Sequence, residues 1–514
     1  MRRTGDDATS FPLWVHAVVQ LKAGRRRDAS WPSILARIRS VVQDKPSDVV
    51  EGLPPHPFCV KMFDIQSSVA QPVAPSLPDE RPLRIVYLTA GAGGMICGSC
   101  LHDNTLARAL IELGHDVQLV PLYTPIETDE PNVSRREVFF GGINLYLQQK
   151  FPLLRRLPKW LDHWLDHPWL IRWAAGRSVK IDPAEVADLT VSLLRGMEGH
   201  QRKEVERLAE WLSGDQRPDV LVFSNVLTAG CVPEIKRRMD VPVVVTLQGD
   251  DIYLDWLPAG HRETCLGLIR ELTPHLDGFL TTSRYYADFM AQYLDLPREK
   301  IEVVYPGLSL SGFPSERGQR GDGTVTIGYL ARICPEKGLH LLVEAFGLLR
   351  GRPDLPPLRL RAAGYCGERD RSYLYELQKK IEQQGWSEQF DYAGELSHQE
   401  KLDFLGGLDI FSVPTTYREP KGLYLLEAWA CGVPAVQPAH GSFPELIERT
   451  GGGLLVEPSN AAALADGLER LIRDSQQRAQ LGVAGRETVR ARFHARRMAE
   501  ETLAVLRRHS RQTA

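Results

Sequence analysis

The feature that most constrains the fold is a regular alternation, from Leu83 onward, of short apolar runs rich in β-branched residues with amphipathic helical stretches. Such alternation is typical of a parallel sheet covered by helices on both faces. Between the first two predicted strands, apolar residues at helical spacing predict a helix over 101–114 that Gly114 ends. The strands predicted in this half are 83–88, 116–123, 219–224, 241–247 and 278–283.

The alternation is interrupted once, by a polar and glycine-rich stretch at 311–323, and then restarts. Since 514 residues are too many for one hydrophobic core, we expect two doubly wound α/β domains, 83–310 and 322–490, that face a cleft. We expect residues 491–514 to form a helix that packs back across it. The strands predicted in the second domain are 324–330, 358–364, 390–394, 409–414, 434–438 and 452–458.

Residues 1–82 form an N-terminal extension that we expect to be largely irregular. Its second part, from about residue 45, is rich in proline and serine, which favours an extended linker. Because Met62 lies inside this linker, the first 61 residues are expected to be either a mis-assigned start or a dispensable extension.

Charge and cysteine usage narrow the class of protein. A net charge of -3 argues against an extended nucleic-acid surface, so no nucleic-acid partner is expected. Eight scattered cysteines indicate free thiols of a reducing compartment rather than a disulfide framework. With no secretory or membrane-spanning segment recognised, the sequence predicts a cytoplasmic protein.

The loop after the first predicted strand reads AGAGGMICGSC, residues 90–100. Its glycines let backbone N–H groups approach a phosphate or sugar closely. An NAD site is disfavoured because Ile96 stands at the third glycine position of that motif. Cys97 and Cys100 form a CxxC without a second ligand pair, so structural thiols are favoured over a redox or metal role, which stays open.

Two further loops follow predicted strands of the second domain. In GYLARICPEKG, Arg332 and Lys337 leave a strand end on a turn, where a phosphate site is favoured over a plain surface loop. In YREPKGLYLLEAWACG, Glu419 and Glu427 stand eight apart, a spacing that Glu263 and Glu271 share by chance. The intervening proline and glycine forbid one continuous helix, so Glu419 belongs to a loop and Glu427 to the next helix. Both carboxylates can then reach different parts of one ligand.

Together, ARICPEKG and EPKGLYLLEAWACGVP resemble motifs of the retaining family 4 GT-B glycosyltransferases (glycosyl transferases group 1), over about residues 83–505. GGMICGSC and LDHPWLIR are also distantly similar to glycogen and starch synthases, although Ala92 stands where those enzymes have a lysine. The resemblance implies a retaining hexosyltransferase that moves a sugar from a nucleotide-diphosphate sugar to a saccharide or lipid-linked acceptor.

The resemblance also implies roles for individual residues. Arg332 and Lys337 match the basic pair that holds the donor diphosphate during catalysis. Glu419 matches a catalytic glutamate near the transferred sugar, and Glu427 matches the carboxylate that binds the ribose hydroxyls. The other donor-binding positions implied are Gly93, Gly94, Leu396, Gly422 and Leu423.

The chain departs from the family pattern on the acceptor or sugar side. Asn225 and Gln248 stand where family members commonly have histidines, with Asp250 nearby, and these three are the candidate acceptor-side residues. Lys421 replaces the usual aromatic residue of the paired-glutamate motif. The base, the sugar, the acceptor, the linkage and the oligomeric state therefore stay open.

Departure of a nucleotide diphosphate places extra negative charge on the leaving group. Arg332, Lys337 and the helix N-terminus before Glu427 could stabilise that charge without reorganising. Because no Asp-x-Asp follows a strand, we expect neither a metal nor another cofactor beyond the nucleotide-sugar co-substrate. The alternatives are an epimerase or phosphorylase on the same fold, or a non-catalytic nucleotide-sugar-binding relative.

The segment 151–177 combines tryptophans on one helical face with basic residues elsewhere. It could pack internally, which is the favoured reading, or seat the protein on an anionic membrane that holds a lipid-linked acceptor. In the second case the protein would be peripheral on the inner membrane face.

Overall fold

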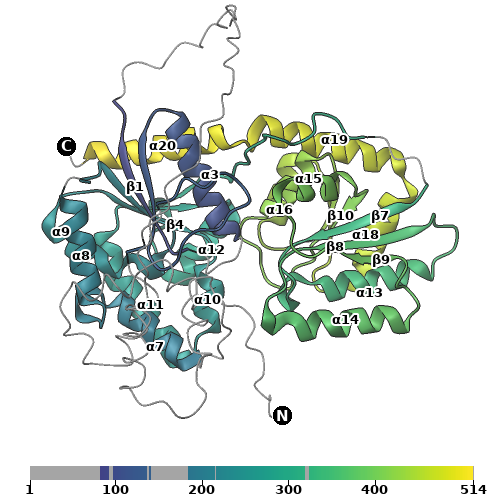
Figure 1. Cartoon of the computed structure of the whole chain (residues 1–514), viewed down its shortest axis with the longest axis horizontal. Coiled ribbons are helices and arrows are strands. Elements are labelled where there is room, and N and C mark those ends of the chain that lie inside the picture. Colours follow the sequence, from purple (N-terminus) through teal and green to yellow (C-terminus); the bar gives the residue numbers. More distant parts are fainter. Residues whose placement is uncertain are drawn as a thin grey trace, which may run out of the picture. The chain divides into compact units, whose positions relative to one another are not determined.

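The computed structural model describes residues 81–91, 97–135, 138–139, 183–214, 216–318 and 323–512. Within these ranges the chain forms two parallel sheets of six strands, each covered by helices (Figure 1). This confirms the predicted α/β fold class. Most of the N-terminal extension and the whole of segment 151–177 lie outside the described residues.

The first sheet has the strand order β2-β1-β3-β4-β5-β6, and every neighbouring pair is parallel. Its strands are β1 (Arg84–Thr89), β2 (Asp116–Pro121), β3 (Val220–Phe223), β4 (Val243–Leu247), β5 (Gly278–Thr281) and β6 (Ile301–Val303). The first five begin and end close to the predicted runs. β6 was not predicted.

Successive side chains of β1 point to opposite faces of the sheet, so they belong to different hydrophobic cores. Ile85 and Tyr87 belong to the core beneath α3 (Gly98–Glu112) and α20 (Ala495–Gln512). Val86 and Leu88 belong to the core on the opposite face. That face is covered by α7 (Pro183–Leu194), α8 (Arg202–Ser213), α9 (Val232–Arg238) and α11 (Ala259–Leu272). The remaining helices of this domain are α10 (Asp250–Trp256) and α12 (Arg284–Leu294).

The last helix of the chain belongs with the first sheet. α20 packs on α3 and also contacts β3. Met498, Ala499, Val505 and Leu506 are buried in the same core as Ile85 and Tyr87. Residues that are far apart in the sequence therefore complete one face of the first domain.

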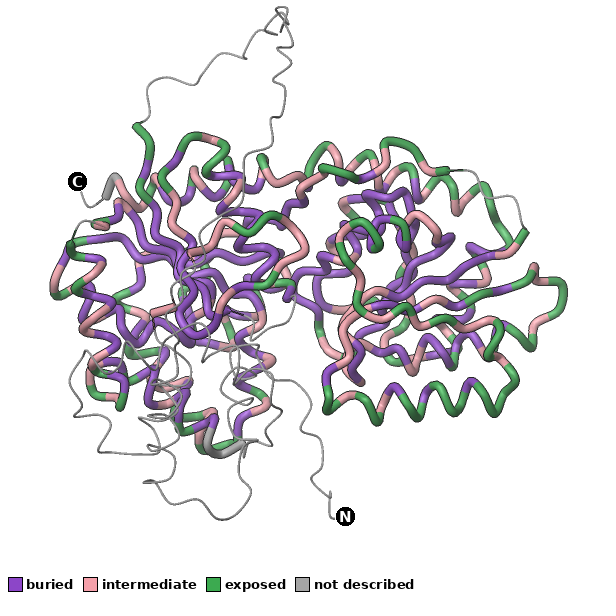
Figure 2. Tube along the Cα trace, in the orientation of Figure 1, coloured by how far each residue is buried: buried purple, intermediate pink, exposed green. Residues whose placement is uncertain are grey.

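The second sheet has the order β12-β11-β10-β7-β8-β9, again with parallel neighbours. Its strands are β7 (Val325–Leu330), β8 (Leu358–Ala363), β9 (Phe390–Tyr392), β10 (Ile410–Phe411), β11 (Ala435–Pro438) and β12 (Gly453–Val456). All six lie within the predicted runs. Figure 2 shows that the strands of both sheets are mostly buried.

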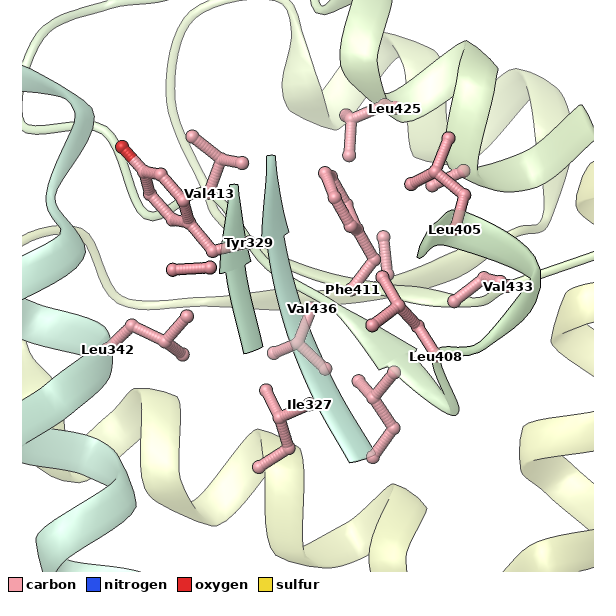
Figure 3. Close-up of a cluster of buried hydrophobic side chains, with 14 of the residues drawn as sticks. Ile327, Tyr329, Leu342, Leu405, Leu408, Phe411, Val413, Leu425, Val433 and Val436 are labelled. Carbon is pink, nitrogen blue, oxygen red and sulfur yellow. The ribbon is translucent and has the colours of Figure 1, made fainter. Parts of the chain in front are cut away.

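Helices lie on both faces of the second sheet (Figure 1). One layer contains α13 (Leu339–Arg350), α14 (Arg371–Gln383) and α18 (Ala461–Arg473). The other contains α15 (His398–Gly406), α16 (Leu423–Ala430), α17 (Phe443–Thr450) and α19 (Ser475–Arg492). Figure 3 shows part of the core between them, with Ile327 and Tyr329 of β7, Phe411 of β10 and Leu425 of α16.

Each sheet has one point at which the direction of strand addition reverses. β1 lies between β2 and β3 in the first sheet, and β7 lies between β8 and β10 in the second. Ligands of such sheets bind outside the carboxyl ends of the strands at this point. The loops after β1, β3, β7 and β10 are therefore where a site is expected, and they contain the motifs that the sequence singled out.

Candidate active site

Loops from both domains line one pocket of about 440 Å³. The first domain contributes residues after β1, β2, β3 and β4, and the second contributes residues after β7, β8, β9 and β10. Among the predicted site residues, those that line this pocket are Arg332, Lys337, Leu396, Glu419, Leu423, Glu427, Asn225, Gln248 and Asp250. These nine residues follow five different strands, β3, β4, β7, β9 and β10, and the fold brings them to one pocket.

The turn after β7 is fixed by its backbone. Residues Pro335–Lys337 form a single 3-10 turn, and α13 begins directly after Gly338. Gly338 has φ 74°, and a Cβ there would lie 1.9 Å from the carbonyl oxygen of Pro414. Only glycine fits this position, which holds the turn bearing Lys337 against the loop that leads to Glu419.

Glu419 is 5% exposed and its carboxylate is surrounded by donors. Its Oε2 accepts from Lys337 Nζ at 2.7 Å, from the Tyr417 hydroxyl at 2.6 Å and from the Tyr424 hydroxyl at 3.0 Å. Its Oε1 accepts from the backbone N–H groups of Lys421 at 3.3 Å and Gly422 at 3.4 Å. Burial alone would raise the pKa of Glu419, but Lys337 and the hydrogen bonds lower it to about 2. The carboxylate is charged and holds Lys337 in place.

Three of these contacts, from Lys421, Gly422 and Tyr424, come from the start of α16. Gly422 is its N-cap with φ 65°, and Leu423 and Tyr424 of the first turn line the pocket. Gly422 itself does not line the pocket, although the resemblance implied a donor contact there. The N-terminus of a helix carries partial positive charge, so this end of α16 adds positive potential to the pocket beside the Lys337–Glu419 pair.

Glu427 lies one turn further along α16 and is tied to both domains through Lys401 of α15. Lys401 Nζ lies 2.5 Å from Glu427 Oε1 and 2.6 Å from Asp129 Oδ2. Burial would lower the pKa of Lys401, but Glu427 and Asp129 raise it above its ordinary value. The ammonium therefore stays charged and fixes one oxygen of Glu427 at the pocket wall.

Arg332 leaves the end of β7 and lines the pocket. Within the described part of the chain, no carboxylate forms an ion pair with its guanidinium. Asp370 interacts with Arg332 only at a longer distance. Burial raises the pKa of Asp370 to about 6, and the positive charge of Arg332 opposes this rise. Glu336 does not bind Arg332 either, because neither of its buried carboxylate oxygens has a hydrogen-bond partner among the described residues. The guanidinium is therefore available to an anion.

The wall contributed by the first domain is built mainly from hydrogen bonds rather than ion pairs. Gln248 Nε2 donates to Asp103 Oδ1 and to the Ser224 carbonyl, both at 3.0 Å. Asp250 accepts from the backbone N–H groups of Val226 at 2.8 Å and Gln248 at 3.0 Å, so it fixes the two loops. Burial raises the pKa of Asp250 to about 6.

Several wall residues were missed by the sequence reasoning. Lys401 and Asp129 meet only through the tertiary fold, so no local pattern marks them. Tyr417 and Tyr424 flank Glu419 in the YREPKGLY stretch, and their spacing around the glutamate was a usable signal. Gly93 and Gly94, by contrast, fall among residues that the structure does not describe.

Cys97 is the N-cap of α3, and both Cys97 and Cys100 are buried free thiols that line the pocket. Among the described residues, no group of three or more His, Cys, Asp or Glu side chains is arranged so that it could hold a metal ion. The helices of the described residues also include none that is long and apolar enough to cross a membrane.

Known folds match this arrangement. Sucrose-phosphate synthase from Thermosynechococcus elongatus superposes with a TM-score of 0.62 at 18% identity, covering 83% of this chain and 98% of that one. HepE from Anabaena, solved in complex with UDP, superposes with a TM-score of 0.56 at 16% identity, covering 83% and 100%. At these identities the likeness concerns the fold alone, which is the GT-B fold of two Rossmann-like domains around one site.

Sequence relatives define the family. The model described as "Glycosyl transferase 4-like domain" matches residues 104–307, and the model described as "Glycosyl transferases group 1" matches residues 315–488. A GDP-mannose-dependent monoacylated alpha-(1-6)-phosphatidylinositol monomannoside mannosyltransferase from Corynebacterium glutamicum is 31% identical over 368 residues, covering 68% of this chain and 86% of that protein. The chain belongs to the glycosyl transferases group 1 family and is a glycosyltransferase.

Proposed function

We propose that this protein transfers a sugar, with retention of anomeric configuration and without a divalent metal, from a nucleotide-diphosphate sugar to a saccharide or lipid-linked acceptor. The observation that carries the proposal is that Arg332, Lys337, Glu427 and the N-terminus of α16 line one pocket. The name of the Corynebacterium glutamicum relative, a GDP-mannose-dependent transferase acting on a phosphatidylinositol mannoside, supports this donor and acceptor chemistry.

The cations would act on the leaving group. When the bond between the anomeric carbon and the diphosphate oxygen breaks, negative charge grows on the diphosphate. Arg332 has no ion pair among the described side chains, and Lys337 is already held by Glu419. Charges that are fixed before the reaction stabilise the transition state without reorganisation. This arrangement can supply the neutralisation that a metal ion supplies elsewhere.

Glu427 would accept hydrogen bonds from the ribose hydroxyls. Lys401 occupies its Oε1 at 2.5 Å, so the carboxylate is held in one orientation in a largely buried position. A charged acceptor forms stronger hydrogen bonds to hydroxyl groups than a neutral one does. The Lys401 and Asp129 contacts would thus position Glu427 without touching the donor themselves.

Glu419 would organise the reacting end of the donor rather than attack it. Five donors already use its two oxygens, and its pKa of about 2 keeps it ionised. A carboxylate engaged in this way is poorly suited to form a covalent sugar intermediate. We therefore assign retention to attack by the acceptor hydroxyl on the face from which the diphosphate departs, with the hydroxyl proton passing to the departing phosphate oxygen.

We also propose that the enzyme acts in the cytoplasm, on the inner face of the membrane when its acceptor is lipid-linked. All described cysteines are free thiols, in keeping with a reducing compartment. Contact with a membrane through 151–177 stays part of this proposal, because those residues lie outside the described ranges.

The test is a panel of UDP, GDP and ADP sugars offered to the full-length protein. We expect one nucleotide to raise the melting temperature, and the free nucleotide to be released only when an acceptor is added, equally well with and without EDTA. NMR of the product should give the anomeric configuration of the donor. Conversion of the donor sugar without any acceptor would instead identify an epimerase, and binding without turnover a non-catalytic relative.

A further inference from the structure

Lys421 places a positive charge inside the pocket at a position that the proposed reaction does not use. The residue is 7% exposed and lines the pocket beside Glu419. Its ammonium donates to Ser99 Oγ at 2.6 Å and to Gln248 Oε1 at 3.0 Å, both of which belong to the first domain. The side chain therefore reaches from the loop before α16 to the opposite wall.

The partners of this ammonium are neutral. Among the residues that the structure describes, no carboxylate lies within ion-pair distance of Lys421. Glu419, two residues away, binds Lys337 with one oxygen and backbone N–H groups with the other. Asp103 accepts from Tyr87, Thr89 and Gln248. Burial lowers the pKa of Lys421, as expected for a buried charge that is not fully compensated.

The backbone beside Lys421 is held in place. The hydroxyls of Thr282 and Ser283 both donate to the Pro420 carbonyl at 3.1 Å. The Lys421 N–H donates to Glu419 Oε1 at 3.3 Å. An ammonium on such an anchored loop is positioned before any ligand arrives, which lowers the cost of binding an anion.

The position of Lys421 indicates which part of the ligand its ammonium would contact. A nucleotide held by Arg332, Lys337 and Glu427 would leave its sugar between the Glu419 loop and the wall formed by Ser99, Asn225 and Gln248. Asn225 Oδ1 is buried there without a hydrogen-bond partner among the described residues. Lys421 would therefore face the transferred sugar or the sugar that attacks it.

We propose that Lys421 is a specificity residue that pairs with a carboxylate of a uronic acid, carried by the donor sugar or by the acceptor. The inference rests on the proposed function, because it takes the nucleotide to bind at Arg332 and Lys337. A carboxylate is favoured over a phosphate because one negative charge balances one ammonium, whereas a phosphate dianion would leave charge uncompensated. A neutral sugar would leave the ammonium with only neutral hydrogen bonds, so the site discriminates against it.

The Cys97 thiol is the competing partner. Its hydrogen bond with Cys100 and the nearby Lys421 charge lower the pKa of Cys97 to about 7, against the effect of burial. A Cys97 thiolate could then balance Lys421 without any ligand. This alternative makes a separate prediction: an anionic sugar would be favoured only once Cys97 is removed.

The experiment compares matched neutral and anionic substrates. Donor pairs are UDP-glucose with UDP-glucuronate and GDP-mannose with GDP-mannuronate, and the acceptor pair is p-nitrophenyl glucoside with p-nitrophenyl glucuronide. Affinity is measured by calorimetry and turnover by nucleotide release. We expect wild type to prefer the uronate member of a donor or acceptor pair by about tenfold or more, the usual size of one buried charge pair. Which pair shows the preference identifies the source of the carboxylate.

Three variants test whether Lys421 itself causes the preference for the uronate substrate. Lys421→Met should abolish the preference, whereas Lys421→Arg should keep most of it and covers the case in which the methionine variant fails to fold. Lys379→Met removes the same charge from an exposed position of α14, outside this pocket, and should change nothing. With Cys97→Ser, the preference should remain as in wild type.

Failure of this inference is distinguishable from failure of the proposed function. Affinity for free UDP or GDP reports the proposed function, and Lys421→Met should leave it unchanged. Nucleotide binding with equal use of neutral and uronate substrates would overturn the role of Lys421 alone. A uronate preference seen only in Cys97→Ser would assign the ammonium to the thiolate and also overturn it. Absence of any nucleotide binding would overturn the proposed function on which it rests.

Discussion

The two walls of the pocket are held together by different kinds of interaction. The wall from the second domain is built on ion pairs of Lys337 with Glu419 and of Lys401 with Glu427, and Lys401 also binds Asp129 of the first domain. The wall from the first domain is built on hydrogen bonds of uncharged side chains such as Gln248, and its acid Asp250 has no cation within ion-pair distance among the described residues. A diphosphate is common to many donors, whereas sugars and acceptors differ. The charged wall thus suits the shared part of the ligand, and the neutral wall the variable part.

Removing a cation from the charged wall should have the largest effect. Lys337→Met removes a positive charge from the proposed diphosphate site and should lower turnover at saturating donor by about 1000-fold. The variant also leaves the buried Glu419 carboxylate without its cation, so the unfolding free energy should fall by about 3 kcal/mol.

The control for this variant separates stability from catalysis. Adding Glu419→Gln to Lys337→Met removes the uncompensated charge, so chemical denaturation should show recovered stability while turnover stays low. Recovery of turnover together with stability would mean that Lys337 acts only through folding.

Glu427→Ala should have the next largest effect and act on donor binding. Loss of charged hydrogen bonds to two ribose hydroxyls should weaken donor affinity by about 100-fold, as measured by calorimetry. Glu448→Ala, at an exposed position of the neighbouring helix α17, is the matched control and should bind as wild type does. Equal affinities of the two variants would remove Glu427 from the donor site.

The two domains should also differ in how their stability responds to pH. Asp251 is buried next to Asp250 in α10, and burial raises its pKa from 3.8 to about 6, so its contribution to stability is largest below pH 3.8 and is lost as pH rises through 6. Glu419 has the opposite sign: its lowered pKa stabilises the fold above pH 4.5, and this is lost as pH falls towards 2.

Asp251→Asn isolates the first of these effects, because the amide oxygen can still accept from the Tyr286 hydroxyl. Between pH 4 and pH 7, wild type should lose about 2 kcal/mol more unfolding free energy than the variant does. Urea denaturation at both pH values measures it, and parallel losses in the two proteins would contradict the assignment.

The smallest effect is expected at the pair of glutamates that shares the eight-residue spacing by chance. Glu263 and Glu271 both lie at exposed positions of α11. Glu271→Ala should change stability by less than about 0.5 kcal/mol and leave turnover unchanged. A large loss of activity would mean that spacing, rather than the loop before α16, marks the functional pair.

Particular elements show which parts of the fold and of the candidate site could be predicted from the sequence. Strands β1 and β7 are long and apolar, and the loops after them carry distinctive residues, so both the strands and Arg332 and Lys337 could be predicted. β6 was missed because it has only three residues, of which Ile301 alone is fully buried. Lys401 and Asp129 could not be found, because their pairing depends on where two domains place distant loops. The identity of Lys421 was visible, but its neutral partners were not.

The return of α20 to the first domain has a consequence for biosynthesis. Leu506 is buried in the core that contains Ile85 and Tyr87, so that core is incomplete until the chain as far as Leu506 has left the ribosome. The first domain is thus synthesised before the second, but its hydrophobic core is completed later. A fragment cut at the domain boundary would expose the apolar face that α20 covers, and expressing either half alone would yield an aggregation-prone product.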